Sequence, residues 1–410
     1  MTGQERVRVM GKRDLAKSTR RPLALLSLLF ILTPMVLTTV PLGTAITGSS
    51  FSPAQSATIW EILDNGFVSD DVRQRDVKFV NATHGWILSQ NTTGTRHGMI
   101  LYTNDSGDSW YQQYYNASQR FEQIAVIDSE TFWVTGIGGL FHTEDAGQSW
   151  NRTSIGDEND FFFGVYFFNS TYGWTSSNNM YKTTDGGKSW VLTESWAFDD
   201  DGGRMIHFIN PLEGWVIGFL GIYHTENGGE TWMKDVDHGG WAMSFVNDVE
   251  AWAIADDWLA HMIDGETWVE QPLPRAAPLS ANTPYFSDIL FLDTNNGWIV
   301  GDETEVAYTP NGGKEWYSQS FPNDNRISAV DFINATHGWA VGRGGYIYRT
   351  INGNSLGSRL WIGPTDPLFL SIVGVLAAAV VIFTGAFLYW RKRKAVNHVQ
   401  HLVTESLKIT

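Results

Sequence analysis

Apolar and polar positions repeat about every forty residues along most of this chain. In one unit, an apolar run that ends in Asn (Val165–Asn169) is followed by the pair Gly173-Trp174 and then by the polar phrase Thr183–Trp190. Short apolar runs between Gly- and Asn-rich turns are typical of β-strands. In the polar phrase, Asp185 can bond nearby backbone N–H groups while Gly supplies positive φ, which is a hairpin signal. One unit therefore predicts four short strands.

The polar phrase recurs, one residue shorter at Asp264–Trp268, and in full at Thr103–Trp110, Thr143–Trp150, Thr225–Trp232 and Thr309–Trp316. We interpret its turn-capping residues as structural, since turn geometry accounts for them: Asp105, Asp145, Asp185, Asn227, Asp264 and Asn311. The upstream tryptophan marks seven units: Trp86, Trp133, Trp174, Trp215, Trp252, Trp298 and Trp339. Four-stranded units with this period predict an all-β fold, a seven-bladed β-propeller over residues 58–362.

The seventh unit is incomplete, because its phrase Thr350–Gly353 lacks the tryptophan. The segment Ile59–Leu63 could supply the missing outer strand, with Trp60 in place of the absent turn tryptophan. A ring closed by strands from both ends of the chain has no exposed sheet edge.

Both ends carry long apolar segments. Residues 1–22 form a basic tail, and residues 23–46 form a signal anchor or a cleavable signal peptide; the residues alone leave both open. Residues 368–390 are uncharged and precede the basic Arg391–Lys394, which predicts a transmembrane helix followed by a cytoplasmic tail, 391–410. We therefore expect a cell-membrane protein with both tails in the cytoplasm and an extracytoplasmic propeller.

Composition agrees with that placement. The chain has no cysteine, so disulfides do not stabilise the ring. We expect a glycoprotein, with glycans on sequons at Asn81, Asn91, Asn116, Asn151, Asn169 and Asn334. The net charge is −16, and because the tails hold many of the basic residues, the propeller is more acidic still. Such a surface repels nucleic acid.

Arginines break this acidic pattern at aligned positions. When the units are aligned on the Asn or Asp that ends the first strand, Arg73, Arg120 and Arg326 share one column, eight residues earlier. Arg75 and Arg204 share a second column, six residues before the marker. We predict a basic, protein-binding patch at the mouth of the ring, because guanidinium groups suit carboxylates. The alternative is that each arginine only pairs with a nearby acid, such as Asp70, Asp71 or Glu122.

Neither metal nor cofactor is expected. Asp199–Asp201 lacks the ligand spacing of a calcium loop and is interpreted as a solvated acidic loop. His142, His224 and His261 recur at one position of different units, which indicates packing.

The phrase Thr-x-Asp-x-Gly-x-Ser-Trp resembles the Asp-box, or BNR repeat, of sialidases, sortilin-type receptors and the photosystem II stability/assembly factor family. Asp-boxes combined with an upstream Gly-Trp, as in His84–Trp86 and His337–Trp339, are most similar to the assembly-factor family over roughly residues 58–354. The resemblance implies a seven-bladed propeller with an arginine-rich patch that holds an immature membrane complex without catalysis. Those proteins are typically lumenal and lack a C-terminal membrane span.

Two other classes are weighed against this one. A sialidase-like glycoside hydrolase would clamp a carboxylate with three arginines, but the Phe/Tyr-Arg-Ile-Pro signature is absent and the predicted ring has seven blades where sialidases have six. A receptor or adhesion module of sortilin type would need a cysteine-rich module. We expect a monomeric, membrane-anchored scaffold that binds subunits of a membrane protein complex and is not an enzyme.

Overall fold

The computed structural model describes residues 59–93, 97–195, 202–255, 257–274, 285–301 and 305–360. They belong to the compact unit Ala57–Thr410. Within these ranges, no helix has the length and apolar character needed to cross a membrane. The expected membrane segments 23–46 and 368–390, the two tails and the acidic loop Asp199–Asp201 lie outside the described residues.

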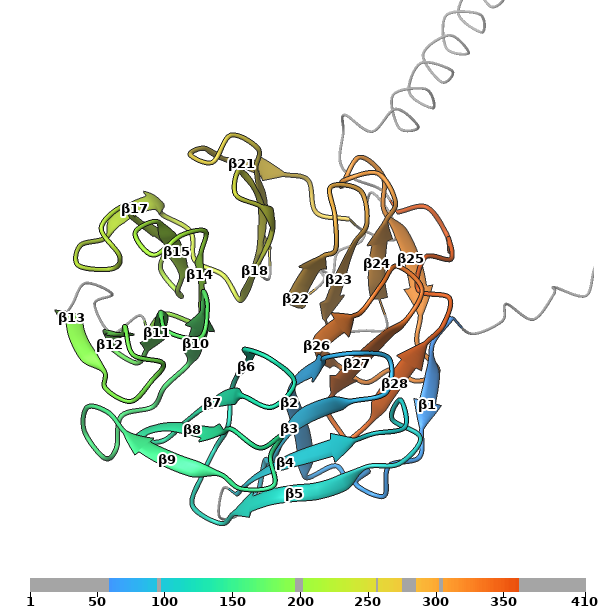
Figure 1. Ribbon diagram of the computed structural model, residues 1–410. Coiled ribbons are helices and arrows are strands. Elements are labelled where there is room, and N and C mark those ends of the chain that lie inside the picture. Colours follow the sequence, from blue (N-terminus) through green and yellow to red (C-terminus); the bar gives the residue numbers. More distant parts are fainter. Residues whose placement is uncertain are drawn as a thin grey trace, which may run out of the picture. The chain divides into compact units, whose positions relative to one another are not determined.

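The described residues form seven four-stranded antiparallel sheets, the blades of the predicted propeller (Figure 1). Blade 1 consists of β2 (Val72–Phe79), β3 (Gly85–Asn91), β4 (Gly98–Thr103) and β5 (Tyr111–Asn116). Blade 2 consists of β6 (Ile124–Val126), β7 (Phe132–Gly136), β8 (Gly139–Thr143) and β9 (Asn151–Ser154). Blade 3 consists of β10 (Gly164–Phe167), β11 (Gly173–Ser176), β12 (Asn179–Thr183) and β13 (Val191–Ser195). Blades 4 and 5 consist of β14 (Met205–Phe208), β15 (Gly214–Ile217), β16 (Ile222–Thr225) and β17 (Met233–Val236); and β18 (Ala242–Asn247), β19 (Glu250–Ile254), β20 (Leu259–Met262) and β21 (Trp268–Gln271). Blades 6 and 7 consist of β22 (Phe286–Phe291), β23 (Gly297–Gly301), β24 (Glu305–Thr309) and β25 (Tyr317–Ser320); and β26 (Ile327–Phe332), β27 (Gly338–Gly342), β28 (Ile347–Thr350) and β1 (Glu61–Leu63).

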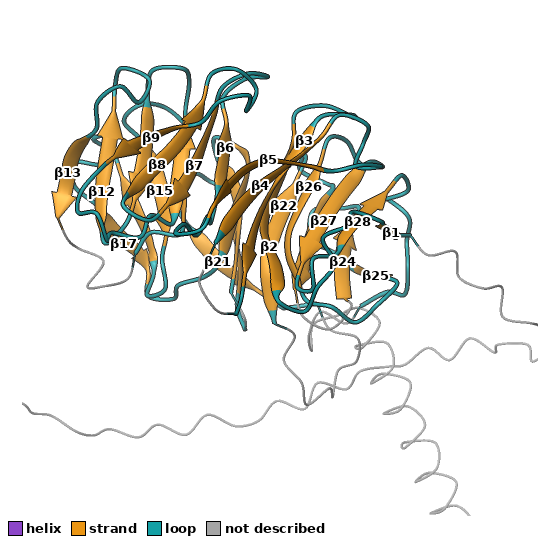
Figure 2. Ribbon diagram, turned by 90° about the horizontal axis from the view of Figure 1, so that it is seen from below, coloured by secondary structure: helices purple, strands orange, loops and turns teal. Residues whose placement is uncertain are grey.

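The first strand of each blade lies at the centre of a closed ring. Each of these innermost strands contacts the innermost strand of the next blade, and β26 of blade 7 contacts β2 of blade 1. Figure 2 shows that loops gather at the two ends of the strands. Residues at equivalent positions of the innermost strands therefore meet at the same end of the ring.

The predicted closure of blade 7 is confirmed. Strand β1 pairs antiparallel with β28, Glu61 opposite Arg349 and Leu63 opposite Ile347. Trp60 is fully buried and meets Phe332 edge-on, with ring centroids 5.7 Å apart and an interplanar angle of 83°. The turn tryptophans of other blades meet the phenylalanine of their own innermost strand in the same way, as Phe79–Trp110, Phe167–Trp190, Phe208–Trp232 and Phe291–Trp316 show.

The Gly-Trp pair joins neighbouring blades. Trp174 of blade 3 stacks on Phe208 of blade 4 with centroids 3.6 Å apart, and its indole N–H donates to the Gly228 carbonyl at 2.9 Å. Gly214 is needed beneath this stack, because a Cβ there would lie 2.5 Å from the Phe208 ring. Aromatic contacts of this kind add to the apolar area that they bury. The pair thus packs one blade against the next.

Carboxylates hold the turn phrases in shape. Asp185 Oδ1 accepts from Thr183 Oγ1 at 2.8 Å and from the Ser189 N–H at 2.9 Å, while Oδ2 accepts from Ser189 Oγ at 2.6 Å. Gly187 has a φ of 84° and donates its N–H to Thr183 Oγ1. The two Oδ1 bonds recur at Asp105, Asp145, Asn227 and Asn311. At the two asparagines the side-chain Nδ2 donates in place of the third bond, to Thr231 Oγ1 and to Glu315 Oε2. The shorter turn uses Asp264 to accept from the N–H groups of Glu266 and Thr267.

We predict that Ser189→Ala will raise the pKa of Asp185. Hydrogen bonds from Ser189 hold that pKa at about 2, below the value in an unfolded chain, so the stabilising effect is present above about pH 4 and is lost as pH falls toward 2. Carbon NMR titration of the carboxyl groups measures the change. Asp145, whose pKa is also about 2, is the control in the same spectrum and should not move. An unchanged Asp185 titration would contradict the role given to the hydroxyl.

Candidate functional site

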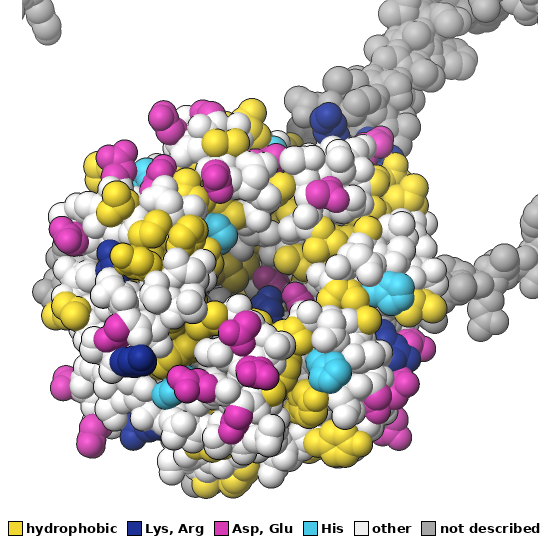
Figure 3. All heavy atoms as spheres, in the orientation of Figure 1, with side chains coloured by type: hydrophobic (Ala, Val, Ile, Leu, Met, Phe, Trp, Pro, Cys, Tyr) yellow, Lys and Arg dark blue, Asp and Glu magenta, His cyan; other side chains and the backbone are white. Residues whose placement is uncertain are grey.

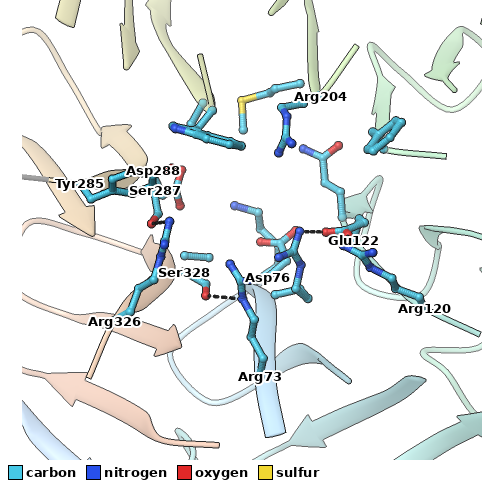
Figure 4. A pocket seen from close by; sticks show the side chains of 18 residues that line it. Arg73, Asp76, Arg120, Glu122, Arg204, Tyr285, Ser287, Asp288, Arg326 and Ser328 are labelled. Carbon is cyan, nitrogen blue, oxygen red and sulfur yellow. Dashed lines mark hydrogen bonds and ion pairs between the residues drawn. The ribbon is translucent and has the colours of Figure 1, made fainter. Parts of the chain in front are cut away.

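A cavity of about 390 Å³ lies among the innermost strands, and the five arginines of the two predicted columns all line it: Arg73, Arg75, Arg120, Arg204 and Arg326. Figure 3 shows the ring hollowed at its centre, with basic and acidic side chains in the hollow. In Figure 4, Arg73 and Arg204 reach into the cavity from opposite sides. The structure therefore brings together residues that are up to about 250 positions apart in sequence.

Repeated position in the blades explains this convergence. Arg204 and Arg326 come directly before the innermost strands β14 and β26, Arg73 lies at the start of β2, and Arg120 lies in the segment that leads into β6. Because the innermost strands are equivalent around the ring, their starts lie at one end of it. The arginines are gathered by the propeller and not by sequence proximity.

A β-bulge turns a further residue toward the cavity. The pairing of β2 with β3 shifts between Gln74 and Asp76, which leaves Arg75 as the extra residue. Arg75 and Asp76 therefore both line the cavity, although consecutive residues of a regular strand face opposite sides. The same shift in blades 6 and 7 adds Ser287 and Ser328 to the lining.

Glu122 is the internal partner of the arginines. Arg75 Nη2 donates to Glu122 Oε2, and Arg120 Nη2 lies 2.6 Å from Glu122 Oε1. The Glu122 side chain is only 8% exposed. Of the acids that the sequence offered as partners, Glu122 thus meets two arginines, and the cavity contains both the basic patch and its counter-charge.

The positive charges act on one another. Burial lowers the pKa of Arg75 well below its usual value, and four positive neighbours lower it further: Arg73, Arg120, Arg204 and Arg326. Serines flank two of these neighbours: Arg73 Nε donates to Ser328 Oγ at 3.4 Å, and Arg326 Nη2 donates to Ser287 Oγ at 3.3 Å. An anion bound here would relieve this repulsion.

Sequence reasoning missed a second charged group inside the ring. Asp76 accepts the Ile124 N–H of the next blade at 2.9 Å, Asp288 accepts the Val330 N–H at 3.0 Å, and Asp331 accepts the Phe79 N–H at 2.7 Å. These carboxylates therefore tie neighbouring innermost strands together. The alignment that found the arginines also places Asp76 and Asp288 in one column, five residues before the marker, which is the signal that could have revealed these two acids.

Burial and Lys78 set the protonation of these acids. Burial raises the pKa of Asp288 to about 7 and also raises that of Asp76. Burial alone would lower the pKa of Lys78, but the carboxylates of Asp331, Asp76 and Asp288 outweigh it and hold that pKa above its usual value. Lys78 Nζ lies 3.6 Å from Asp331 Oδ1. The positive charge of Lys78 therefore offsets the negative charge of the buried carboxyl groups around it.

The remaining candidate residues lie outside the cavity. The three repeated histidines stack on tryptophans, in the pairs Trp133–His142, Trp215–His224 and Trp252–His261. In the part of the chain that the structure describes, no three His, Asp or Glu side chains are grouped to hold a metal ion. Of the sequon asparagines, four are exposed (Asn81, Asn151, Asn169 and Asn334) and two are half-buried (Asn91 and Asn116).

These features define a class of protein, a closed seven-bladed β-propeller of Asp-box repeats with an arginine-lined central cavity. The family model described as photosynthesis system II assembly factor YCF48 matches residues 52–160 and 264–407, more than half of the chain. The chain belongs to this family, and the resemblance seen in its repeats is confirmed.

Two curated relatives match part of the chain. The photosystem II assembly lipoprotein Ycf48 of Synechococcus sp. (strain CC9902) is 26% identical over 106 residues, which cover 24% of this chain. The chloroplastic photosystem II stability/assembly factor HCF136 of Oryza sativa subsp. japonica is 27% identical over 137 residues, 30% of this chain. In each case the match spans 32% of the relative, about a third of its length.

Solved structures share the fold. A structure described as YCF48 bound to D1 peptide has a TM-score of 0.58 and 20% identity, covering 73% of this chain and 99% of that one. YCF48 from Cyanidioschyzon merolae has a TM-score of 0.55 and 15% identity, covering 73% of this chain and 100% of that one. An inactive virginiamycin B lyase from Staphylococcus aureus has a TM-score of 0.57 and 12% identity, covering 71% and 98%. At these identities the likeness concerns the propeller alone.

Proposed function

We propose that this protein is a non-catalytic scaffold that assists the assembly or stability of a membrane protein complex by holding an acidic segment of one subunit. The observation that carries the proposal is the gathering of Arg73, Arg75, Arg120, Arg204 and Arg326 in one cavity of an otherwise acidic protein. Membership of an assembly-factor family supports it, and one solved relative is described as bound to a peptide, of D1.

The cavity suits a carboxylate ligand. A guanidinium presents a planar fork of N–H donors that matches a carboxylate in a bidentate fashion. The acidic surface of the chain would repel an acidic segment elsewhere, so the cavity would fix where the segment docks. The docking position would then be set both by attraction inside the cavity and by repulsion from the acidic surface around it.

The carboxylates of the cavity support binding over catalysis. Asp76 and Asp288 each accept backbone N–H groups, and Glu122 accepts from Arg75 and forms an ion pair with Arg120. A glycoside hydrolase needs two carboxyl groups placed on either side of a scissile bond. The acids here are engaged in holding strands and arginines, which favours the scaffold over the sialidase-like alternative.

Placement at a membrane belongs to the same proposal. The apolar segments 23–46 and 368–390 would anchor the chain, with both tails in the cytoplasm and the propeller outside it, where the exposed sequons could carry glycans. Tethering beside the client raises its effective concentration, so a weak contact would suffice. A single ring of seven complete blades needs no second copy for closure.

The test is a pull-down of the full-length protein in mild detergent, with mass spectrometry, compared with the triple variant Arg73→Glu, Arg120→Glu and Arg326→Glu. We expect one set of membrane-complex subunits to co-purify with the natural chain and to be lost with the variant. Circular dichroism of the variant must show a folded ring. If the folded triple variant retained the subunits, the cavity would not be the binding site. If no membrane protein co-purified with the natural chain, the proposed scaffold function would be wrong.

A further inference from the structure

The cavity has two chemically unlike halves, and we infer that it recognises an acidic side chain next to a large apolar one in the same peptide segment. This inference rests on the proposed function and specifies the partner's chemistry. Blades 7, 1 and 2 supply one half, and blades 3 to 6 supply the other.

The first half is cationic. It is built from Arg326 of blade 7, Arg73 and Arg75 of blade 1, and Arg120 of blade 2, with Glu122 between Arg75 and Arg120. Glu122 pairs with two of these four guanidinium groups, while Asp76, the other acid of this half, accepts backbone N–H groups. A ligand carboxylate would therefore enter an environment of net positive charge.

The second half is aromatic. In the first arginine column, blade 6 carries Tyr285, and in the second column blades 3 and 5 carry Phe163 and Trp241; all three line the cavity. The rings follow one another around the rim: Trp241 lies edge-on to Phe219, with centroids 5.7 Å apart, and 6.4 Å from Tyr285. Blades 4 to 6 thus form a continuous aromatic wall.

Part of this wall is open to solvent. Phe219 packs on the lining residues Arg204 and Trp241 without lining the cavity itself, and it is 45% exposed. It lies at the tip of the β15–β16 hairpin, where the Gly218 N–H donates to the Gly221 carbonyl and the adjoining Leu220 is 51% exposed. Tyr285 is 38% exposed. Exposed apolar side chains that border a cavity with convergent polar groups are typical of a ligand site.

Arg204 joins the two halves. Its guanidinium carbon lies 3.6 Å from the Phe219 ring centroid and 4.2 Å from that of Trp241, so the cation rests between two aromatic faces. Arg326 likewise lies over Tyr285, at 4.6 Å. A guanidinium that uses its face for cation–π contact still directs its N–H groups along its edge. Carboxylate and apolar contacts are thus available side by side.

Size limits how the ligand can be arranged. A cavity of about 390 Å³ is small for a ligand site and accommodates only a few side chains. The acidic and apolar residues of the partner must therefore be near neighbours in its sequence. An acidic stretch without an apolar neighbour would leave the aromatic wall exposed to water.

The test is calorimetric titration of the full-length protein in detergent with short peptides capped at both ends, so that only side chains carry charge. The peptides contain Glu-Phe, Glu-Ser or Gln-Phe at their centre. We expect Glu-Phe to bind about tenfold tighter than Glu-Ser, as burial of one aromatic side chain implies, and Gln-Phe to bind weakly.

The protein variant is Phe219→Ser with Leu220→Ser, and its matched control is Leu212→Ser, an apolar residue of the same blade that is 58% exposed on the β14–β15 turn. All three positions are at the surface, so both proteins should fold. Because Trp241 and Tyr285 remain in the lining, the double variant should show a reduced preference for Glu-Phe over Glu-Ser, whereas the control should keep the full preference.

The outcomes separate the two proposals. Equal binding of Glu-Phe and Glu-Ser by the natural chain, or an undiminished preference in the double variant, would overturn the inference and leave carboxylate binding intact. Failure of both acidic peptides to bind would overturn the acidic-segment proposal together with it.

Discussion

Replacing Glu122 by glutamine will lower the stability of the ring and raise its affinity for carboxylate ligands. Glu122 is the internal counter-charge of Arg75 and Arg120 and is almost fully buried. Removal of one partner from a buried ion pair typically costs about 3–5 kcal/mol, because the remaining charge stays buried without compensation. Here the remaining charges are several arginines: burial already lowers the pKa of Arg75, and repulsion from the others lowers it further.

The gain in affinity has the same physical cause. In the natural chain, a ligand carboxylate must share Arg75 and Arg120 with Glu122, whereas in the variant it would be the main anion beside them. We expect the variant to bind a capped Glu-Phe peptide at least about tenfold tighter, although its free energy of unfolding is lower.

Thermal unfolding and calorimetric titration measure the two effects together. Glu130→Gln is the matched control: it removes the same charge from an exposed position of the same blade, on the β6–β7 turn, and should change neither quantity. Weaker peptide binding by the Glu122 variant would show that Glu122 positions the arginines for the ligand and does not compete with it.

Replacing Trp60 by alanine will strongly destabilise the ring at the blade that closes it. Trp60 is fully buried, contacts Phe321 and Phe332, and donates its indole N–H to Gln319 Oε1 at 3.2 Å. Truncation of a buried tryptophan to alanine costs about 3–5 kcal/mol through lost contacts and a residual cavity. The loss falls beside the strand that completes blade 7, so we expect this blade to open first.

Hydrogen exchange followed by mass spectrometry locates the effect. Amides of β28 should lose protection in the Trp60 variant while those of β11 and β15, on the far side of the ring, keep it. The control is Ile62→Ala, two residues further on in β1, at a side chain that is 39% exposed. Uniform loss of protection in all blades would contradict local opening at the closure.

Sequence reasoning succeeded where a residue's role repeats. The upstream tryptophan recurs in all seven units and determined the number of blades, and the incomplete turn phrase of the last unit showed that blade 7 lacked one strand. The aligned arginines converge in the structure for the same reason, since an equivalent position in each blade is an equivalent position around the ring. Whether the cavity binds protein stays a prediction.

The rest of the site depends on departures from regularity. The bulge between Gln74 and Asp76 places two consecutive residues in the cavity, which period-2 alternation forbids. Glu122 was one of several acids that could pair with the arginines, and only the folded ring shows that it lies between two of them. Trp241 and Tyr285 of the aromatic wall occupy the same columns as the arginines, but aromatic residues are so common in this chain that they carried no signal.

The junction of β1 and β28 also constrains how the protein is made. Its two strands pair residues 288 positions apart, Glu61 with Arg349. During synthesis, six blades can form in order, but β1 has no partner until the last hairpin, which contains β28, has been synthesised. Until then the growing sheet array has two open edges that can pair with other chains. Completion of the ring is thus a late, long-range step, and a slow one for a β topology.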